Sequence, residues 1–145
     1  MQDRFKFRCY NNKDNTIYDV YSFDNNFIRA NPYNACINSI RTFKTSDCIL
    51  MQCTGLKDKN SKLIYEGDII QFYIDDDDPY ARSFVTMKIV WEDYELDFKA
   101  IGLNKNVECY KDDYQYLSCI NIQQDELEVI GNIYENPELL EGHND

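Results

Sequence analysis

The sequence predicts a mainly-β protein, built as a small antiparallel barrel or roll with a short helical turn near its C-terminus. Two observations support this prediction: many short segments alternate apolar and polar residues, and turns rich in Asn, Asp and Gly separate them. With 43% hydrophobic and 14% aromatic residues in a chain of 145, there are enough apolar side chains for a packed core. We therefore expect a single domain over residues 1–145.

The N-terminal arm, residues 1–23, is expected to form a β-hairpin. In residues 4–10 apolar and basic side chains alternate, which is the period of a half-buried strand. Residues 11–15 contain only Asn, Lys and Asp, and Asn and Asp favour a turn before a second strand over residues 16–23. The Asn-rich segment 24–45 has no clear period, so an irregular insertion is expected there, with a helical turn as the alternative.

The barrel core is expected over residues 46–140, followed by a polar tail over residues 141–145. Its predicted strands are residues 47–54, 69–74, 84–91, 96–101, 114–122 and 127–134. Trp91 shares an apolar face with its neighbours, so we expect it to anchor the core. Near the end, Asn136 is placed as the N-cap of a helical turn and Pro137 as its first residue.

The sharpest motif precedes the strand at residue 69 and consists of Tyr65, Glu66, Gly67 and Asp68. A polar turn, then Gly-Asp, then a β-branched strand is common in small SH3-like barrels. Gly67 permits a bend, and Asp68 can accept hydrogen bonds from nearby amides. We favour a turn that sets the register of the next strand. The alternative is a binding edge, so these four residues form part of a candidate interaction surface.

The second part of that surface is a run of four acidic residues, Asp75, Asp76, Asp77 and Asp78. Hard cations prefer carboxylates, but this run lacks the spacing of an EF-hand loop. A solvated loop that protects a strand edge is the favoured interpretation. A metal-dependent hydrolase that combines the run with Glu92 and Asp93 is a weaker alternative.

Cysteine and histidine usage points to no catalytic, cofactor or metal site. The six cysteines are Cys9, Cys36, Cys48, Cys53, Cys109 and Cys119. Their irregular spacing, without a C-x-x-C pair, favours reduced thiols that act as small hydrophobic residues. The only histidine, His143, lies in the polar tail, so a nucleophile–base pair has little support. We therefore expect no enzyme and infer no small-molecule substrate.

The charge excludes further classes of function. Acidic residues number 26 and basic residues 15, which gives a net charge of −11. This surplus disfavours nucleic acid and anionic membranes as ligands. The chain also lacks an apolar run of about 18 residues and an apolar signal core, so we expect a cytoplasmic protein. The twelve tyrosines favour protein contacts over base stacking, because no basic cluster accompanies them.

Two long blocks resemble a known family. The first is LMQCTGLKDKN at residues 50–60 with IYEGDII at residues 64–70, and the second is LEVIGNIYENPELL at residues 127–140. Both are similar to the hallmarks of the YopX-like family, small proteins encoded by bacteriophages and prophages. The opening FKFR at residues 5–8 and Val90-Trp91 also fit. The resemblance implies a mainly-β body of SH3-type barrel or roll character, but no catalytic residues and no assigned role.

Members often have Gly where Ser61 stands, and the segments 24–44 and 75–82 match little of the family. Because the residues suggest no catalytic site and the chain resembles this family, we expect a non-catalytic phage or prophage accessory protein in the cytoplasm of a bacterial host. We expect it to bind another protein or itself. One alternative is a nucleic-acid-binding small barrel. Another is an acidic inhibitor of a host nucleic-acid-binding or defence protein, by imitation of the charge of DNA.

Overall fold

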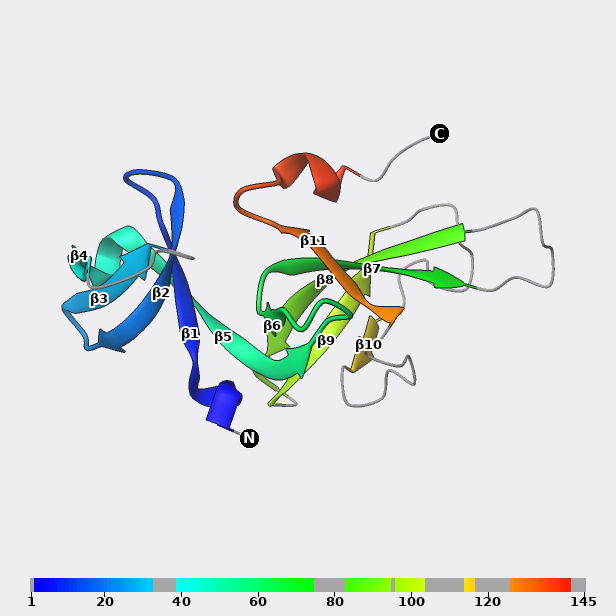
Figure 1. Ribbon diagram of the computed structural model, residues 1–145, viewed down its shortest axis with the longest axis horizontal. Helices are drawn as coiled ribbons and strands as arrows, with labels where there is room; N and C mark the ends of the chain where they lie inside the picture. Colours follow the sequence, from blue (N-terminus) through cyan, green and yellow to red (C-terminus); the bar gives the residue numbers. More distant parts are fainter. Residues whose placement is uncertain are drawn as a thin grey trace. The chain divides into compact units, whose positions relative to one another are not determined.

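The computed structural model describes residues 2–32, 39–74, 83–94, 96–103, 114–116 and 126–141 (Figure 1). The described chain is mainly β, with two antiparallel sheets and short 3-10 turns, so the predicted fold class is confirmed. Among the described strands, both sheet orders are open and no closed barrel forms. The SH3-like detail stays a prediction. The chain divides into two compact units, residues 1–55 and 56–145, which are described in turn.

The first unit contains five consecutive strands, the last of which continues into the second unit. They are β1 (Phe7–Asn11), β2 (Thr16–Phe23), β3 (Phe27–Pro32), β4 (Arg41–Lys44) and β5 (Cys48–Lys57), with 3-10 turns η1 (Gln2–Phe5) and η2 (Thr45–Asp47). The sheet order is β4-β3-β2-β1-β5-β6, where β6 (Leu63–Tyr65) belongs to the second unit. The predicted hairpin is confirmed, and its turn ends at Asn15 with a left-handed backbone (φ 57°), which Asn tolerates.

The expectation of an irregular segment over residues 24–45 is wrong where the structure describes it. β3 and β4 lie within it and pair with each other, with Ile28 opposite Phe43 and Ala30 opposite Arg41. Ile28 and Ala30 are fully buried. The Asn-rich composition weakens the local strand signal, but pairing and burial of these two apolar side chains override it. Residues 33–38 lie outside the described part of the chain.

The core of the first unit is a small cluster of apolar side chains on one face of the sheet. Its fully buried members are Cys9, Tyr18, Ile28 and Ala30, and Val20, Phe43, Cys48 and Leu50 pack against them. Cys9, Cys48 and Cys53 are reduced thiols in buried or half-buried positions, as predicted for small hydrophobic residues. The other three cysteines lie outside the described residues.

The second unit is organised around a five-stranded sheet with the order β10-β9-β8-β7-β11. Besides β6, its elements are β7 (Asp68–Ile74), β8 (Ser83–Glu92), β9 (Asp97–Gly102), β10 (Tyr114–Tyr116), β11 (Glu128–Asn132) and the 3-10 turn η6 (Pro137–Leu140). The predicted strands are confirmed here with small shifts at their ends. The prediction for residues 114–122 is confirmed for 114–116, and the remainder lies outside the described residues.

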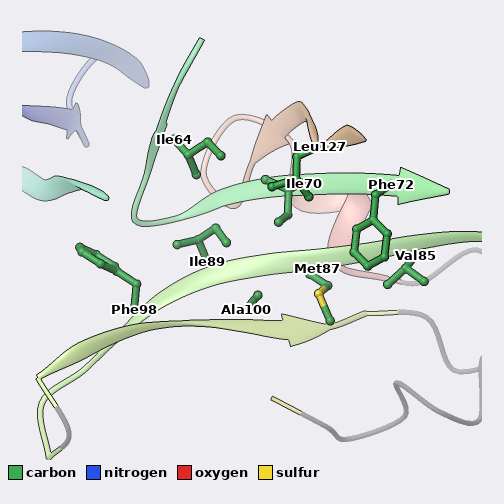
Figure 2. Packing of buried hydrophobic residues seen from close by; sticks show 9 residues of the cluster. All are labelled: Ile64, Ile70, Phe72, Val85, Met87, Ile89, Phe98, Ala100 and Leu127. Atoms are coloured by element: carbon green, nitrogen blue, oxygen red, sulfur yellow. The ribbon is translucent and has the colours of Figure 1, made fainter. Parts of the chain in front are cut away.

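Nine buried side chains form the core of the second unit (Figure 2). They are Ile64, Ile70, Phe72, Val85, Met87, Ile89, Phe98, Ala100 and Leu127. Trp91 packs against this cluster and meets the Phe98 ring edge-on at 4.9 Å between centroids, so its predicted core role is confirmed. Burial of each large aliphatic side chain contributes about 2 kcal/mol, so this core is the main stabilising feature of the unit.

Candidate functional site

The first hallmark block folds around the carboxylate of Asp58, which is 5% exposed. Its Oδ1 accepts hydrogen bonds from the backbone N–H groups of Asn60 and Lys62, at 2.8 and 2.9 Å. Its Oδ2 accepts one from the N–H of Val129, 71 residues further along the chain, at 3.0 Å. Ser61 has a left-handed backbone (φ 63°), a conformation that favours glycine. Asp58 therefore joins the turn between β5 and β6 to the edge strand β11.

The Tyr65–Asp68 motif forms a buried turn. The backbone N–H of Tyr65 donates to Asp68 Oδ2 at 2.8 Å, and Gly67 adopts a left-handed conformation (φ 82°). Gly67 also donates its N–H to the carbonyl of Ile89, while its own carbonyl accepts the N–H of Ile133, both at 2.8 Å. These bonds fix the start of β7 between its two neighbouring strands, as expected for a turn that sets register.

The same turn limits what the motif can offer to a partner. Tyr65 is 6% exposed, Asp68 1%, and Gly67 is also buried. Glu66 is half-buried and is the most accessible of the four. The interaction surface predicted for this motif therefore stays a prediction, with Glu66 as its accessible member.

The second hallmark block is a compact turn after β11. The Oδ1 of Asn132 accepts hydrogen bonds from the N–H groups of Tyr134 and Glu135, at 3.1 and 2.9 Å. A Cβ atom added at Gly131 would lie 2.5 Å from Asn136 Oδ1, so a larger residue does not fit without movement. The predicted helical turn is a 3-10 turn and begins as expected, with Asn136 as N-cap and Pro137 after it. The capping bond is different, because Asn136 Oδ1 accepts from Asn132 N–H at 3.3 Å rather than from its own turn.

An exposed aromatic pair lies on the outer face of the five-stranded sheet. Tyr73 on β7 stands directly opposite Phe84 on β8, and their ring centroids are 3.9 Å apart. Tyr73 is 53% exposed and Phe84 39%, while the intervening Phe72 points into the core. We call Tyr73 and Phe84 the aromatic pair. Sequence reasoning missed this pair. The signal was present, because side chains alternate between the two faces of a strand, so Tyr73 and Phe84 lie on the face opposite to Phe72 and Val85.

Polar groups border the aromatic pair on the same face. The side chain of Gln71 donates from Nε2 to Thr86 Oγ1 at 3.3 Å. These two residues also stand opposite each other, two residues along each strand from the aromatic pair. Glu128 on β11 stands opposite Gln71 and forms an ion pair with Lys59 at 2.6 Å. The Glu128 hydrogen bond raises the pKa of Lys59 above its ordinary value.

The acidic residues proposed for a metal site do not gather in the described structure. Asp75, Asp76, Asp77 and Asp78 lie outside the described residues. Glu92 accepts a hydrogen bond from Lys99 Nζ at 3.1 Å, which is the main reason that its pKa lies below the ordinary value. Within the described ranges, no three Asp, Glu, His or Cys side chains are close enough to hold a metal ion.

The first unit carries a different electrostatic feature. Asp19 on β2 stands opposite Arg8 on β1, and Arg8 is only 3% exposed. Burial raises the pKa of Asp19, and the nearby charges of Arg8 and Lys6 oppose this shift. This arrangement places a half-buried carboxylate beside cationic groups and so balances charge within the sheet.

Within the described part of the chain, no helix is long and apolar enough to cross a membrane.

Comparisons with known proteins agree with this architecture. The model of the YopX protein family matches residues 6–141, so the match includes both hallmark blocks and both units. The crystal structure of protein EF1440 from Enterococcus faecalis is similar, with a TM-score of 0.55, 25% sequence identity, and coverage of 93% of this chain and 96% of that chain. The comparison with curated proteins gives no match. Because the family model matches nearly the whole length, the chain belongs to the YopX protein family.

Proposed function

We propose that this chain is a non-catalytic accessory protein of a bacteriophage or prophage, and that it acts in the cytoplasm of a bacterial host by binding another protein. The observation that carries the proposal is the aromatic pair, because two adjoining exposed rings bordered by hydrogen-bonding groups have the composition of an interface centre. A tyrosine in such a position offers a large, stiff contact area at low cost in conformational entropy.

The hallmark blocks support the non-catalytic part of this proposal, because their polar side chains have structural roles. The Asp58 and Asp68 carboxylates accept backbone hydrogen bonds inside the second unit, and Asn132 does the same in the C-terminal turn. These polar side chains therefore stabilise turns. The aromatic pair, in contrast, contributes exposed apolar surface beyond what the core requires.

Affinity capture from a bacterial lysate tests the proposal, with bound proteins identified by mass spectrometry. We expect a specific protein with the wild-type chain and its loss with the Tyr73→Ser, Phe84→Ser double variant. Tyr94→Ser is the matched control. Tyr94 is 92% exposed and lies in the turn that follows β8, whereas Phe84 lies at the opposite end of that strand. Recovery of no protein, together with a monomeric sedimentation profile, would overturn the proposal.

A second candidate function, the acidic inhibitor, is favoured by the distribution of charge. Residues 56–145 contain 21 acidic and 8 basic residues, a net charge of −13, whereas residues 1–55 contain 5 acidic and 7 basic residues, a net charge of +2. A strongly acidic unit attracts basic, DNA-binding surfaces. If this candidate is correct, duplex DNA will compete with the chain for the captured protein. Capture that is insensitive to DNA would exclude it.

A further inference from the structure

The aromatic pair belongs to a strongly acidic unit. The described residues of the second unit alone carry eleven acidic and five basic side chains, so the surplus of negative charge does not depend on the segments that the structure leaves out. Two of the five basic groups, Lys59 and Lys99, already form ion pairs with Glu128 and Glu92. A partner that approaches this unit therefore meets an attractive field only if it is cationic.

The charge also argues against two other occupants of this face. A second copy of the chain would bring another unit of net charge −13 against the first, and the repulsion would oppose self-association. Nucleic acid would be repelled for the same reason. The occupant that fits is a cationic segment of a different protein.

The rings discriminate between the two kinds of cationic side chain. The guanidinium group of arginine is planar and weakly hydrated, so it stacks on aromatic faces more readily than the compact ammonium of lysine. Tyr73 and Phe84 form one contiguous aromatic surface with 3.9 Å between their centroids, and more than half of the Tyr73 surface is exposed. The carboxylate of Glu128 on the same face is already engaged by Lys59 at 2.6 Å, so the two rings themselves are the contact surface that a guanidinium would find.

We propose that the aromatic pair is a docking site for an arginine-rich segment of another protein. This inference rests on the proposed function, because it specifies the chemistry of the partner and the face that receives it. The negative charge of the unit attracts the segment, and stacking of guanidinium groups on Tyr73 and Phe84 selects arginine over lysine.

The test uses fluorescein-labelled nona-arginine and nona-lysine as probes, with fluorescence anisotropy at about 50 mM salt, where charge attraction is strong. We expect the wild-type chain to bind nona-arginine about fivefold more tightly than nona-lysine, as cation–π stacking at an exposed site allows. The Tyr73→Leu, Phe84→Leu double variant keeps apolar side chains and net charge but lacks the rings. It should bind both peptides with equal affinity. Tyr94→Leu is the control and should keep the preference for arginine.

Equal binding of both peptides by the wild-type chain would overturn the inference, as would an unchanged preference in the double variant. If the double variant does not fold, amide NMR on the wild-type chain replaces it. Addition of nona-arginine should then shift the Gln71 and Thr86 resonances, and unshifted resonances with bound peptide would place the contact elsewhere. A negative peptide result beside successful lysate capture would end this inference and leave the proposed function standing.

Discussion

The two units of this protein differ in charge and in how far along the chain the aspartate carboxylates of two of their turns reach for hydrogen-bond donors. In the first unit, the Asp24 carboxylate accepts bonds from Asn26 and Phe27, only two and three residues away. In the second, Asp58 reaches Val129 across 71 residues. Among the described residues, the buried cluster of the first unit has four members and that of the second has nine. Over the full sequence, the net charges of the two units are +2 and −13.

The difference shows that the first hallmark block has a long-range architectural role. Asp58 and Gly67 make hydrogen bonds to strands distant in the sequence, whereas the bonds of Asn132 in the second block stay within its own turn. Stability of this unit should therefore depend on single polar residues, whereas the turns of the first unit should tolerate their loss. The experiments below test that contrast, in order of decreasing effect.

Asp58→Ala should have the largest effect. It leaves three backbone N–H groups without their acceptor in a site that is 5% exposed, so we expect a loss of about 3 kcal/mol in the free energy of unfolding. Urea denaturation measures this loss. Asp58→Asn is the control, because its side-chain oxygen preserves one acceptor, and it should cost less. A loss no larger than that of an exposed turn residue would remove the contrast between the units.

Gly131→Ala should rank second, with a cost of about 2 kcal/mol. The new methyl group would lie 2.5 Å from Asn136 Oδ1 and displace the side chain that accepts the Asn132 N–H. A double-mutant cycle with Asn136→Ala isolates this clash, because Gly131→Ala should cost far less when the Asn136 amide is absent. Strict additivity of the two substitutions would show that the contact is not the cause.

The first unit should respond to alkaline pH through Cys9. Burial, followed by the neighbouring Cys48, raises the pKa of this thiol to about 12. Because the unfolded thiol ionises near pH 9, its contribution to stability is complete below that pH and is lost as the pH rises towards about 12.

The unfolding free energy of the wild-type chain, measured by urea denaturation, should therefore be about 1 kcal/mol lower at about pH 10 than at about pH 8. Cys9→Ala should lower stability at both pH values, because it empties a buried position, but it should reduce the difference between them. The same pH dependence in wild type and variant would assign the effect to another group.

Asp24→Ala should have the smallest effect, since the side chain is exposed and its bonds are local. These backbone bonds hold the pKa of Asp24 below its ordinary value of 3.8. Its stabilising contribution is therefore present above that pH and disappears as the pH falls through the lowered value. The urea midpoint of the variant should fall less than that of Asp58→Ala near neutral pH, and the small difference from wild type should vanish in acid. An equal or larger fall would reverse the ranking.

Much of the fold could be predicted from local patterns in the sequence. Alternation gave the positions of β1, β2, β7 and β8, and Asn136-Pro137 predicted the start of η6, because these signals depend on neighbouring residues alone. β3 and β4 were missed, since Asn-rich flanks hide a short apolar pattern that becomes clear only when Ile28 and Phe43 face each other. The aromatic pair was missed for a similar reason, because exposure of Tyr73 depends on which face of the sheet the core covers.

The sequence by itself determined the class of fold, the surplus of acid, the reduced state expected for the thiols and the resemblance to the YopX family, because composition and short-range period carry that information. Tertiary structure decided what the hallmark residues do. Asp68 was expected to accept hydrogen bonds from nearby amides, but Asp58 resembles a surface acid in the sequence, and only the fold shows that both are buried and that Asp58 accepts from Val129. It also brought Tyr73 beside Phe84, because only strand pairing places residues eleven positions apart in direct contact.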